Sequence, residues 1–228
     1  MAGRDRNYAV LTGDLVKSSR LAPAESRKAI ALLKKAASDF EKTFPGTIEG
    51  ELDSFRHDSW QLLLKRPALA VRAAIFLRAA LRMQPDLHKC DTRVAIGIGP
   101  VETISRRRVS DSRGAAFTRS GTALDATGNR CLAFASSGER EDECVARAVA
   151  PLLDSLISDW TATESRAVYG ALRDWTQEES ARQWPVARGQ KRPTRQAVAK
   201  ALRRAHWNQV QSVLDWLEKS MQPLRVAN

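Results

Sequence analysis

Apolar positions in the first part of the chain recur with two different periods. A period of two residues is typical of half-buried strands, whereas a period of 3.6 residues is typical of helices that pack on one side. The first period predicts strands over about 8–14, 54–64, 92–102 and 131–135, of which the second is a hairpin. The second period predicts helices over about 24–44, 68–83 and 120–132.

These elements follow one another in the order β-α-β-β-α-β, with a short α/β extension behind them. This order is that of the ferredoxin-like, or palm, fold, in which two β-α-β units share one sheet. We therefore predict an α+β domain of this kind over residues 1–145.

The remaining residues, 146–228, contain no strand pattern and predict an all-α domain. Threonine precedes three of its helices, and a threonine hydroxyl is a favoured N-cap because it accepts a hydrogen bond from a free backbone N–H. These predicted caps are Thr161, Thr176 and Thr194. The predicted helices span about 144–158, 162–174, 176–184, 194–206 and 208–219.

Composition narrows the class of protein and of partner. The net charge of +11 favours an anionic partner, either a nucleotide or a nucleic acid, without choosing between them. The three cysteines have no metal-like spacing, which suits free thiols in a reducing cytoplasm. No apolar run is long enough to span a bilayer, and the first residues lack the apolar core of a signal peptide. We expect a cytoplasmic protein with no membrane partner.

Two aspartates mark the ends of neighbouring predicted strands. Asp14 closes the first strand, and Asp58 lies at the tip of the hairpin. Hard cations take oxygen ligands, and Mg²⁺ typically binds one or two carboxylates while substrate phosphates complete its shell. The same positions also suit aspartates that only cap a turn or a following helix.

Four segments follow one another in an order that is also found in other proteins. They are Gly13–Arg20, the hairpin Asp58, Arg93–Gly99, and Ser120–Gly121 with Leu124–Asp125. In this combination the chain resembles the SatD family of bacterial proteins and, more distantly, class III nucleotide cyclases and other palm-type nucleotidyl enzymes. The resemblance implies that Asp14 and Asp58 hold Mg²⁺ or Mn²⁺. It also implies that a nucleoside triphosphate binds the turn after the first strand, formed by Leu15, Val16, Lys17, Ser18, Ser19 and Arg20.

Two departures from the cyclase pattern bear on turnover. Cyclase-like hairpins carry glycine before the metal-binding aspartate, where this chain has His57. Cyclases also use an asparagine and an arginine on a late helix, whereas Asn129 and Arg130 are adjacent here and would point about 100° apart on a helix. We therefore expect nucleotide binding to be tighter than turnover is efficient, and we assign no catalytic residue.

The second domain resembles a helix-turn-helix of the sigma-region-four kind over 163–168, 176–181 and 194–205. The resemblance implies a third helix that contacts double-stranded DNA, while Val198 and Leu202 anchor it. The usual short turn is replaced by the longer segment 185–193, and an ordinary helical bundle with a basic surface is the alternative. The residues expected to face DNA are Arg195, Gln196, Ala199, Lys200 and Arg203.

Three hypotheses follow from these patterns. The first is a regulator that binds DNA and responds to a nucleotide bound in the palm. The second is a palm-type cyclase or nucleotidyltransferase that makes a nucleotide signal. The third is a catalytically inactive palm that serves oligomerisation. Because cyclase sites form across a dimer interface, a homodimer is compatible with each of the three.

Overall fold

The fold is centred on a mixed five-stranded sheet. The structure is a computed structural model that describes residues 7–84, 87, 90–105, 107–138, 140–186 and 191–222. The strand order is β2-β3-β1-β4-β5, with antiparallel pairing among the first four strands and β5 parallel to β4. The predicted α+β class and the order of these elements are confirmed. The strands are β1 (Asn7–Leu15), β2 (Ile48–Phe55), β3 (Ser59–Leu64), β4 (Thr92–Pro100) and β5 (Leu132–Ala135).

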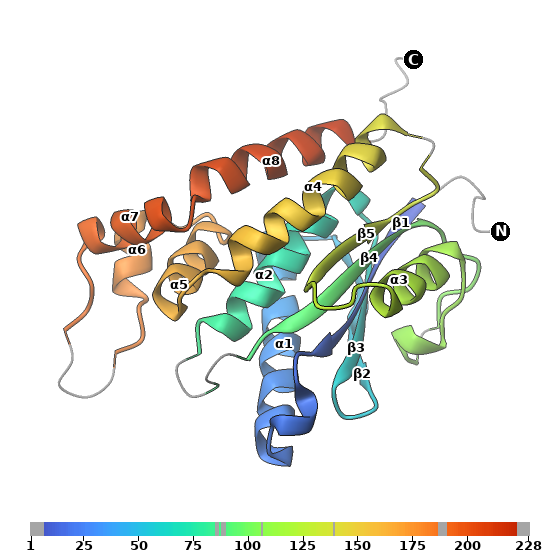
Figure 1. Ribbon diagram of the computed structural model, residues 1–228, viewed down its shortest axis with the longest axis horizontal. Coiled ribbons are helices and arrows are strands. Elements are labelled where there is room, and N and C mark those ends of the chain that lie inside the picture. Colours follow the sequence, from blue (N-terminus) through green and yellow to red (C-terminus); the bar gives the residue numbers. More distant parts are fainter. Residues whose placement is uncertain are drawn as a thin grey trace.

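Different helices cover the two faces of the sheet, with α1 (Pro23–Thr43) and α2 (Ala70–Arg82) on one face and α3 (Ala115–Asp125) on the other (Figure 1). Ala9, Leu11 and Leu15 join the large core beneath α1 and α2. Val10, one position out of step, packs in a smaller cluster with Ala116. That residue belongs to α3, which covers the other face. The period of two seen in the sequence therefore separates a thick apolar layer from a thinner, more polar one.

The helix expected at 120–132 is wrong in its bounds, because α3 runs from Ala115 to Asp125. Its early start depends on Gly97 of β4, where a Cβ would lie 2.2 Å from the carbonyl oxygen of Ala116. Its C-cap is Ala126, and two residues later Gly128 has a φ of +62°, which suits glycine. The first feature is a contact between distant segments and the second is a local backbone conformation. The spacing of hydrophobic residues along the sequence predicts neither of them.

In the described part of the chain five helices follow β5, and the three predicted threonine caps are confirmed. Each threonine hydroxyl accepts a hydrogen bond from the backbone N–H three residues later. Residue 145, the expected domain boundary, lies within α4, whose buried side chains join the same core as the sheet. Among the described residues, no helix is long and apolar enough to cross a membrane. The helices are α4 (Glu141–Ser158), α5 (Ala162–Ala171), α6 (Gln177–Arg182), α7 (Arg195–Arg204) and α8 (Trp207–Ser220).

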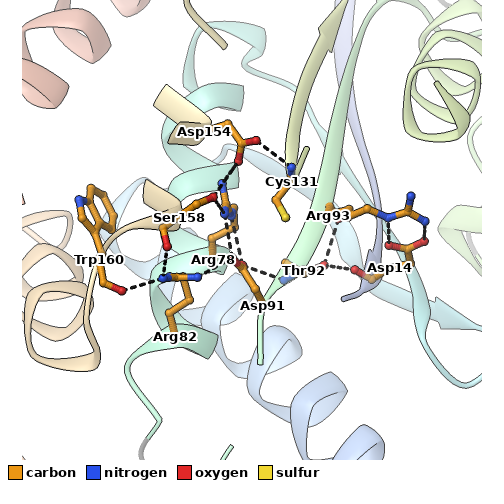
Figure 2. A network of polar contacts seen from close by, with 10 residues as sticks. All are labelled: Asp14, Arg78, Arg82, Asp91, Thr92, Arg93, Cys131, Asp154, Ser158 and Trp160. Carbon is orange, nitrogen blue, oxygen red and sulfur yellow. Dashed lines mark hydrogen bonds and ion pairs between the residues drawn. The ribbon is translucent and has the colours of Figure 1, made fainter. Parts of the chain in front are cut away.

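A buried arginine joins the sheet to these helices (Figure 2). Arg78 of α2 is 0% exposed, and its Nη2 and Nη1 lie 2.7 Å from carboxylate oxygens of Asp91 and Asp154, respectively. Asp154, on α4, also accepts a hydrogen bond of 2.9 Å from the backbone N–H of Cys131. Burial acts to lower the pKa of Arg78, but the two carboxylates raise it overall, so the side chain stays charged.

A second arginine extends this network toward the C-terminal helices. Arg82 contacts Asp91 at 2.9 Å and donates to the carbonyl oxygens of Ser158 at 2.7 Å and Trp160 at 2.6 Å. The Trp160 indole in turn donates to the carbonyl oxygen of Ala205 at 3.0 Å. Two arginines on one helix thus bind the segment before β4 and the end of α4, and Trp160 extends the network to the junction between α7 and α8.

Arg78→Leu should destabilise the protein by about 3–5 kcal/mol, because it leaves Asp91 and Asp154 buried without their common partner. Urea unfolding followed by tryptophan fluorescence measures this change. Arg107→Leu is the matched control, since Arg107 is exposed and should change stability by no more than about 0.5 kcal/mol. A destabilisation no larger than that of the control would contradict the central place given to Arg78.

Candidate functional site

Asp14 lies near the end of β1 on the face covered by α3. Its neighbours across the sheet are Ser59 on β3 and Arg93 on β4. The Arg93 guanidinium binds both carboxylate oxygens, with Nε 2.7 Å from one and Nη2 against the other (Figure 2). The pair is partly open to solvent, with 19% of the Asp14 side chain and 33% of the Arg93 side chain exposed. The hydrogen bond to Asp14 raises the pKa of Arg93.

Asp58 lies in the hairpin loop, directly before the residue that pairs with Asp14. Its carbonyl oxygen accepts a hydrogen bond of 3.1 Å from the N–H of Leu15. Its carboxylate accepts one of 2.6 Å from the hydroxyl of Ser18 and a longer one of 3.3 Å from Ser59. The register therefore brings the two predicted aspartates to the same edge of the sheet, where the turn after β1 begins.

The turn after β1 divides into an anchored and an exposed part. Leu15 is buried, and the N–H of Val16 donates to the carbonyl oxygen of Asp91 at 2.9 Å. Lys17 then adopts a left-handed conformation with φ of 56° and opens the short 3₁₀ turn Ser18–Arg20. Of the six predicted nucleotide-binding residues, the last four are thus on the open side.

The exposed part of this turn presents polar groups to solvent. Its internal hydrogen bonds begin at the N–H groups of Arg20 and Leu21, so the amides of residues 17–19 precede the first bonded one. Lys17, Ser19 and Arg20 have exposed side chains. Successive amides beside a left-handed residue form a concave surface that suits an anion, and the two cationic side chains add to it.

The donor set at this edge has the chemistry that a hard cation requires, namely carboxylate oxygens with hydroxyls nearby. Within the described residues, however, no group of three or more histidine, cysteine, aspartate or glutamate side chains is placed to hold a metal ion. Asp14 and Asp58 would need phosphate oxygens to complete a coordination shell. Arg93 would compete with a metal ion for the carboxylate oxygens of Asp14.

The sequence-based interpretation missed the role of Arg93, which it treated only as part of a strand. Arg93 follows Asp14 by 79 positions, and only the register of β1 against β4 makes the two residues direct neighbours. A charged residue inside an otherwise apolar strand run was the available signal, because such residues need a partner when half-buried.

Asn129 and Arg130 do not lie on a helix, although the asparagine and arginine of the cyclase pattern do. Both follow the end of α3 in a turn and are exposed. The turn is closed by Thr127, whose hydroxyl donates to the carbonyl oxygens of Ala123 and Leu124 at 2.8 and 2.6 Å. Arg130 is held in the same turn, where its Nε donates to the carbonyl oxygen of Thr127 at 3.4 Å. The pair therefore does not lie on a helix, where the cyclase pattern has it.

The face of α7 expected to contact DNA is largely open. Arg195, Gln196, Lys200 and Arg203 are exposed, and Ala199 is half-buried. The opposite face behaves as anticipated, because Val198 is fully buried and Leu202 is half-buried against its cluster. Of the connector 185–193, residues 187–190 lie outside the described part of the chain.

A shallow groove of about 880 Å³ lies beside this face. It mixes basic side chains of α7 with acidic and aromatic side chains from the end of α5 and the start of α6. Its lining includes Arg195 and Arg203 as well as Asp174, Trp175 and Glu178. The basic surface of α7 is therefore bordered on one side by carboxylates.

The comparisons with known proteins show one partial similarity to a solved structure and assign no family. No family model matches the chain, and no curated protein matches it. Among solved structures, the guanylyl cyclase Cya2 is similar over 53% of this chain and 70% of its own, with 20% identity and a TM-score of 0.38. A likeness at this level carries no argument about activity.

The hairpin loop before Asp58 stores backbone strain. Arg56 and His57 have φ values of 53° and 56°, and left-handed backbone costs a residue with a Cβ about 1–2 kcal/mol. Consecutive left-handed residues are typical of tight hairpin turns, which favour glycine there. The loop nevertheless keeps histidine at the position beside the candidate metal ligand.

His57→Gly should therefore stabilise the protein by about 1 kcal/mol, since glycine adopts this conformation without steric cost. Chemical denaturation measures the gain. Glu102→Gly is the control, because Glu102 is exposed and is not among the residues with positive φ. That variant should be less stable than wild type through the entropy of the unfolded chain. A destabilised His57→Gly would show that the histidine side chain makes compensating contacts.

Proposed function

We propose that the protein binds a nucleoside triphosphate together with Mg²⁺ or Mn²⁺ at the turn 17–20, between Asp14 and Asp58. The observation that carries this proposal is the hydrogen bond of 2.6 Å from Ser18 to Asp58. It holds the exposed turn that follows the left-handed Lys17 against a carboxylate, at the edge where Asp14 also lies. An anion site and a cation site are thereby adjacent, which is the arrangement that a metal–triphosphate complex needs.

Each group has a distinct task in such a complex. The amides of residues 17–19 and the side chains of Lys17 and Arg20 would bind phosphate oxygens. Asp14 and Asp58 would supply carboxylate oxygens to the cation, which neutralises charge on the phosphates when it is bound. The resemblance to SatD proteins and to palm-type nucleotidyl enzymes supports the same assignment from the sequence.

Binding without efficient turnover is the interpretation that the site favours. Phosphoryl or cyclase chemistry depends on groups fixed where negative charge develops in the transition state. Asn129 and Arg130 lie in an exposed turn after α3 and not on a helix, so they do not supply the pair of the cyclase pattern. We therefore prefer a nucleotide-responsive regulator to an active cyclase or nucleotidyltransferase.

Asp58→Asn should weaken the binding of Mg·ATP or Mg·GTP by at least about tenfold, because it removes the charge that attracts the cation and holds Ser18. Isothermal titration calorimetry on the full chain measures this change. Ser18→Ala should weaken binding in the same direction while keeping both carboxylates. Asp111→Asn, at an exposed aspartate of the 3₁₀ turn Val109–Asp111, is the matched control.

The regulator and the enzyme predict different outcomes in this experiment. If neither nucleotide binds the wild-type protein in the presence of Mg²⁺ or Mn²⁺, the proposed function is wrong. Rapid release of pyrophosphate from ATP or GTP would instead favour the enzyme over the regulator.

A second function, binding of duplex DNA through α7, is proposed on one observation. The exposed side chains of this helix combine Arg195, Lys200 and Arg203 with the amide of Gln196. Arginine and glutamine suit base edges, and lysine and arginine suit phosphates. The alternative is a bundle whose basic face serves assembly, including a homodimer.

Reversing two charges, Lys200→Glu with Arg203→Glu, should weaken duplex binding and reduce the magnitude of the salt slope by about two, one for each DNA phosphate that the variant no longer neutralises. Fluorescence anisotropy at several salt concentrations measures both effects. The control is Arg27→Glu with Lys34→Glu, which makes the same charge change on exposed positions of α1. Equal weakening in both double variants would indicate non-specific attraction, and the absence of wild-type binding at low salt would exclude the proposal.

A further inference from the structure

The Asp14 carboxylate is already paired with a positively charged side chain, the guanidinium of Arg93. Arg93 faces it directly across the sheet and binds both of its oxygens. Such a forked pair is the strongest arrangement that an arginine and a carboxylate form. The carboxylate of Asp125, at the end of α3, adds to the effect of Asp14 in raising the pKa of Arg93.

A guanidinium and a divalent cation compete for this carboxylate. The fork of Arg93 donates hydrogen bonds to both oxygens, so a metal ion would share them with a positive charge only a few ångströms away. Two positive charges at that separation repel each other, and the partial burial of the pair limits screening by solvent. An ion bound to Asp14 is thus opposed as long as Arg93 stays in place.

A triphosphate offers Arg93 a second partner of the same geometry. Guanidinium forks match phosphate oxygens as well as they match carboxylate oxygens. The Arg93 side chain is one third exposed, and it extends from the strand next to the one that ends in the nucleotide turn. Its release from Asp14 needs only a side-chain movement, because the backbone of β4 is held by pairing on both sides.

We propose that Arg93 is a latch that makes metal binding depend on the nucleotide. Without nucleotide it neutralises Asp14 and opposes the cation; with nucleotide it moves to the phosphates and frees Asp14 for the ion. This inference rests on the proposed nucleotide site and adds its regulation. By linkage, the cation and the nucleotide then each raise the affinity of the site for the other.

The test is a titration of the full-length protein with Mn²⁺, followed by electron paramagnetic resonance of the free ion, with and without a non-hydrolysable ATP or GTP analogue. Wild-type protein should bind Mn²⁺ at least about tenfold more tightly when the analogue is present, after correction for the ion that the analogue binds by itself. Arg93→Gln should bind Mn²⁺ without nucleotide about tenfold more tightly than wild type, and the analogue should add little.

Three further variants separate the latch from simpler effects. Arg93→Lys keeps the charge without the fork, so its Mn²⁺ affinity should lie between those of wild type and Arg93→Gln. Asp14→Asn combined with Arg93→Gln should abolish the gain, because the freed carboxylate is gone. Arg113→Gln, which removes an arginine from the loop before α3, should leave Mn²⁺ binding unchanged. Circular dichroism confirms that each variant is folded.

The outcomes distinguish this inference from the function on which it rests. Equal Mn²⁺ affinity in wild type and Arg93→Gln, with nucleotide binding intact, would overturn the latch and leave the nucleotide site standing. A gain that survives removal of Asp14 would also overturn it, since the ion would then bind elsewhere. No binding of either Mn²⁺ or nucleotide by any of these proteins would overturn both proposals.

Discussion

The ion pairs of Arg78 are the constraint on which the candidate site depends. Arg78 is fully buried, and its two carboxylate partners come from the segment before β4 and from α4. Asp91 also receives, at its carbonyl oxygen, the N–H of Val16 at the start of the nucleotide turn. The chain continues from Asp91 through Thr92 to Arg93. The buried ion pair between Arg78 and Asp91 therefore helps to position both the turn after β1 and the Arg93 side chain beside Asp14.

The buried ion pairs of Arg78 and the partly exposed ion pair of Arg93 differ in how much free energy it costs to break them. Breaking a buried pair leaves a charge without water or partner, so the contacts of Arg78 resist rearrangement. The pair of Arg93 with Asp14 is partly solvated, so it can open at a smaller cost. A response to a ligand would therefore begin at Arg93.

Local signals predicted much of this fold, and long-range contacts explain what they missed. The threonine caps and the order of the elements can be predicted from neighbouring residues, and both are confirmed. The hairpin expected at 54–64 was too short, because β2 begins at Ile48. The bounds of α3 depend on the close approach that Gly97 permits, which no local pattern encodes. The placement of Asp14 and Asp58 at one edge followed from element order, whereas the pairing of Asp14 with Arg93 depends on the register between strands far apart in sequence.

The same pairing bears on whether the site is built for catalysis. Of the groups at the edge of the sheet, Arg93 is the cation held closest to Asp14, and it is held there by a ground-state ion pair. A cation that moves onto the phosphates of a bound nucleotide stabilises the bound state, and it speeds a reaction only if that contact strengthens as charge develops on the reacting phosphate. Only an interaction that is stronger in the transition state accelerates a reaction. If the proposed latch operates, Arg93 would link the binding of the nucleotide to that of the cation, and turnover would need an additional group fixed over the reacting phosphate.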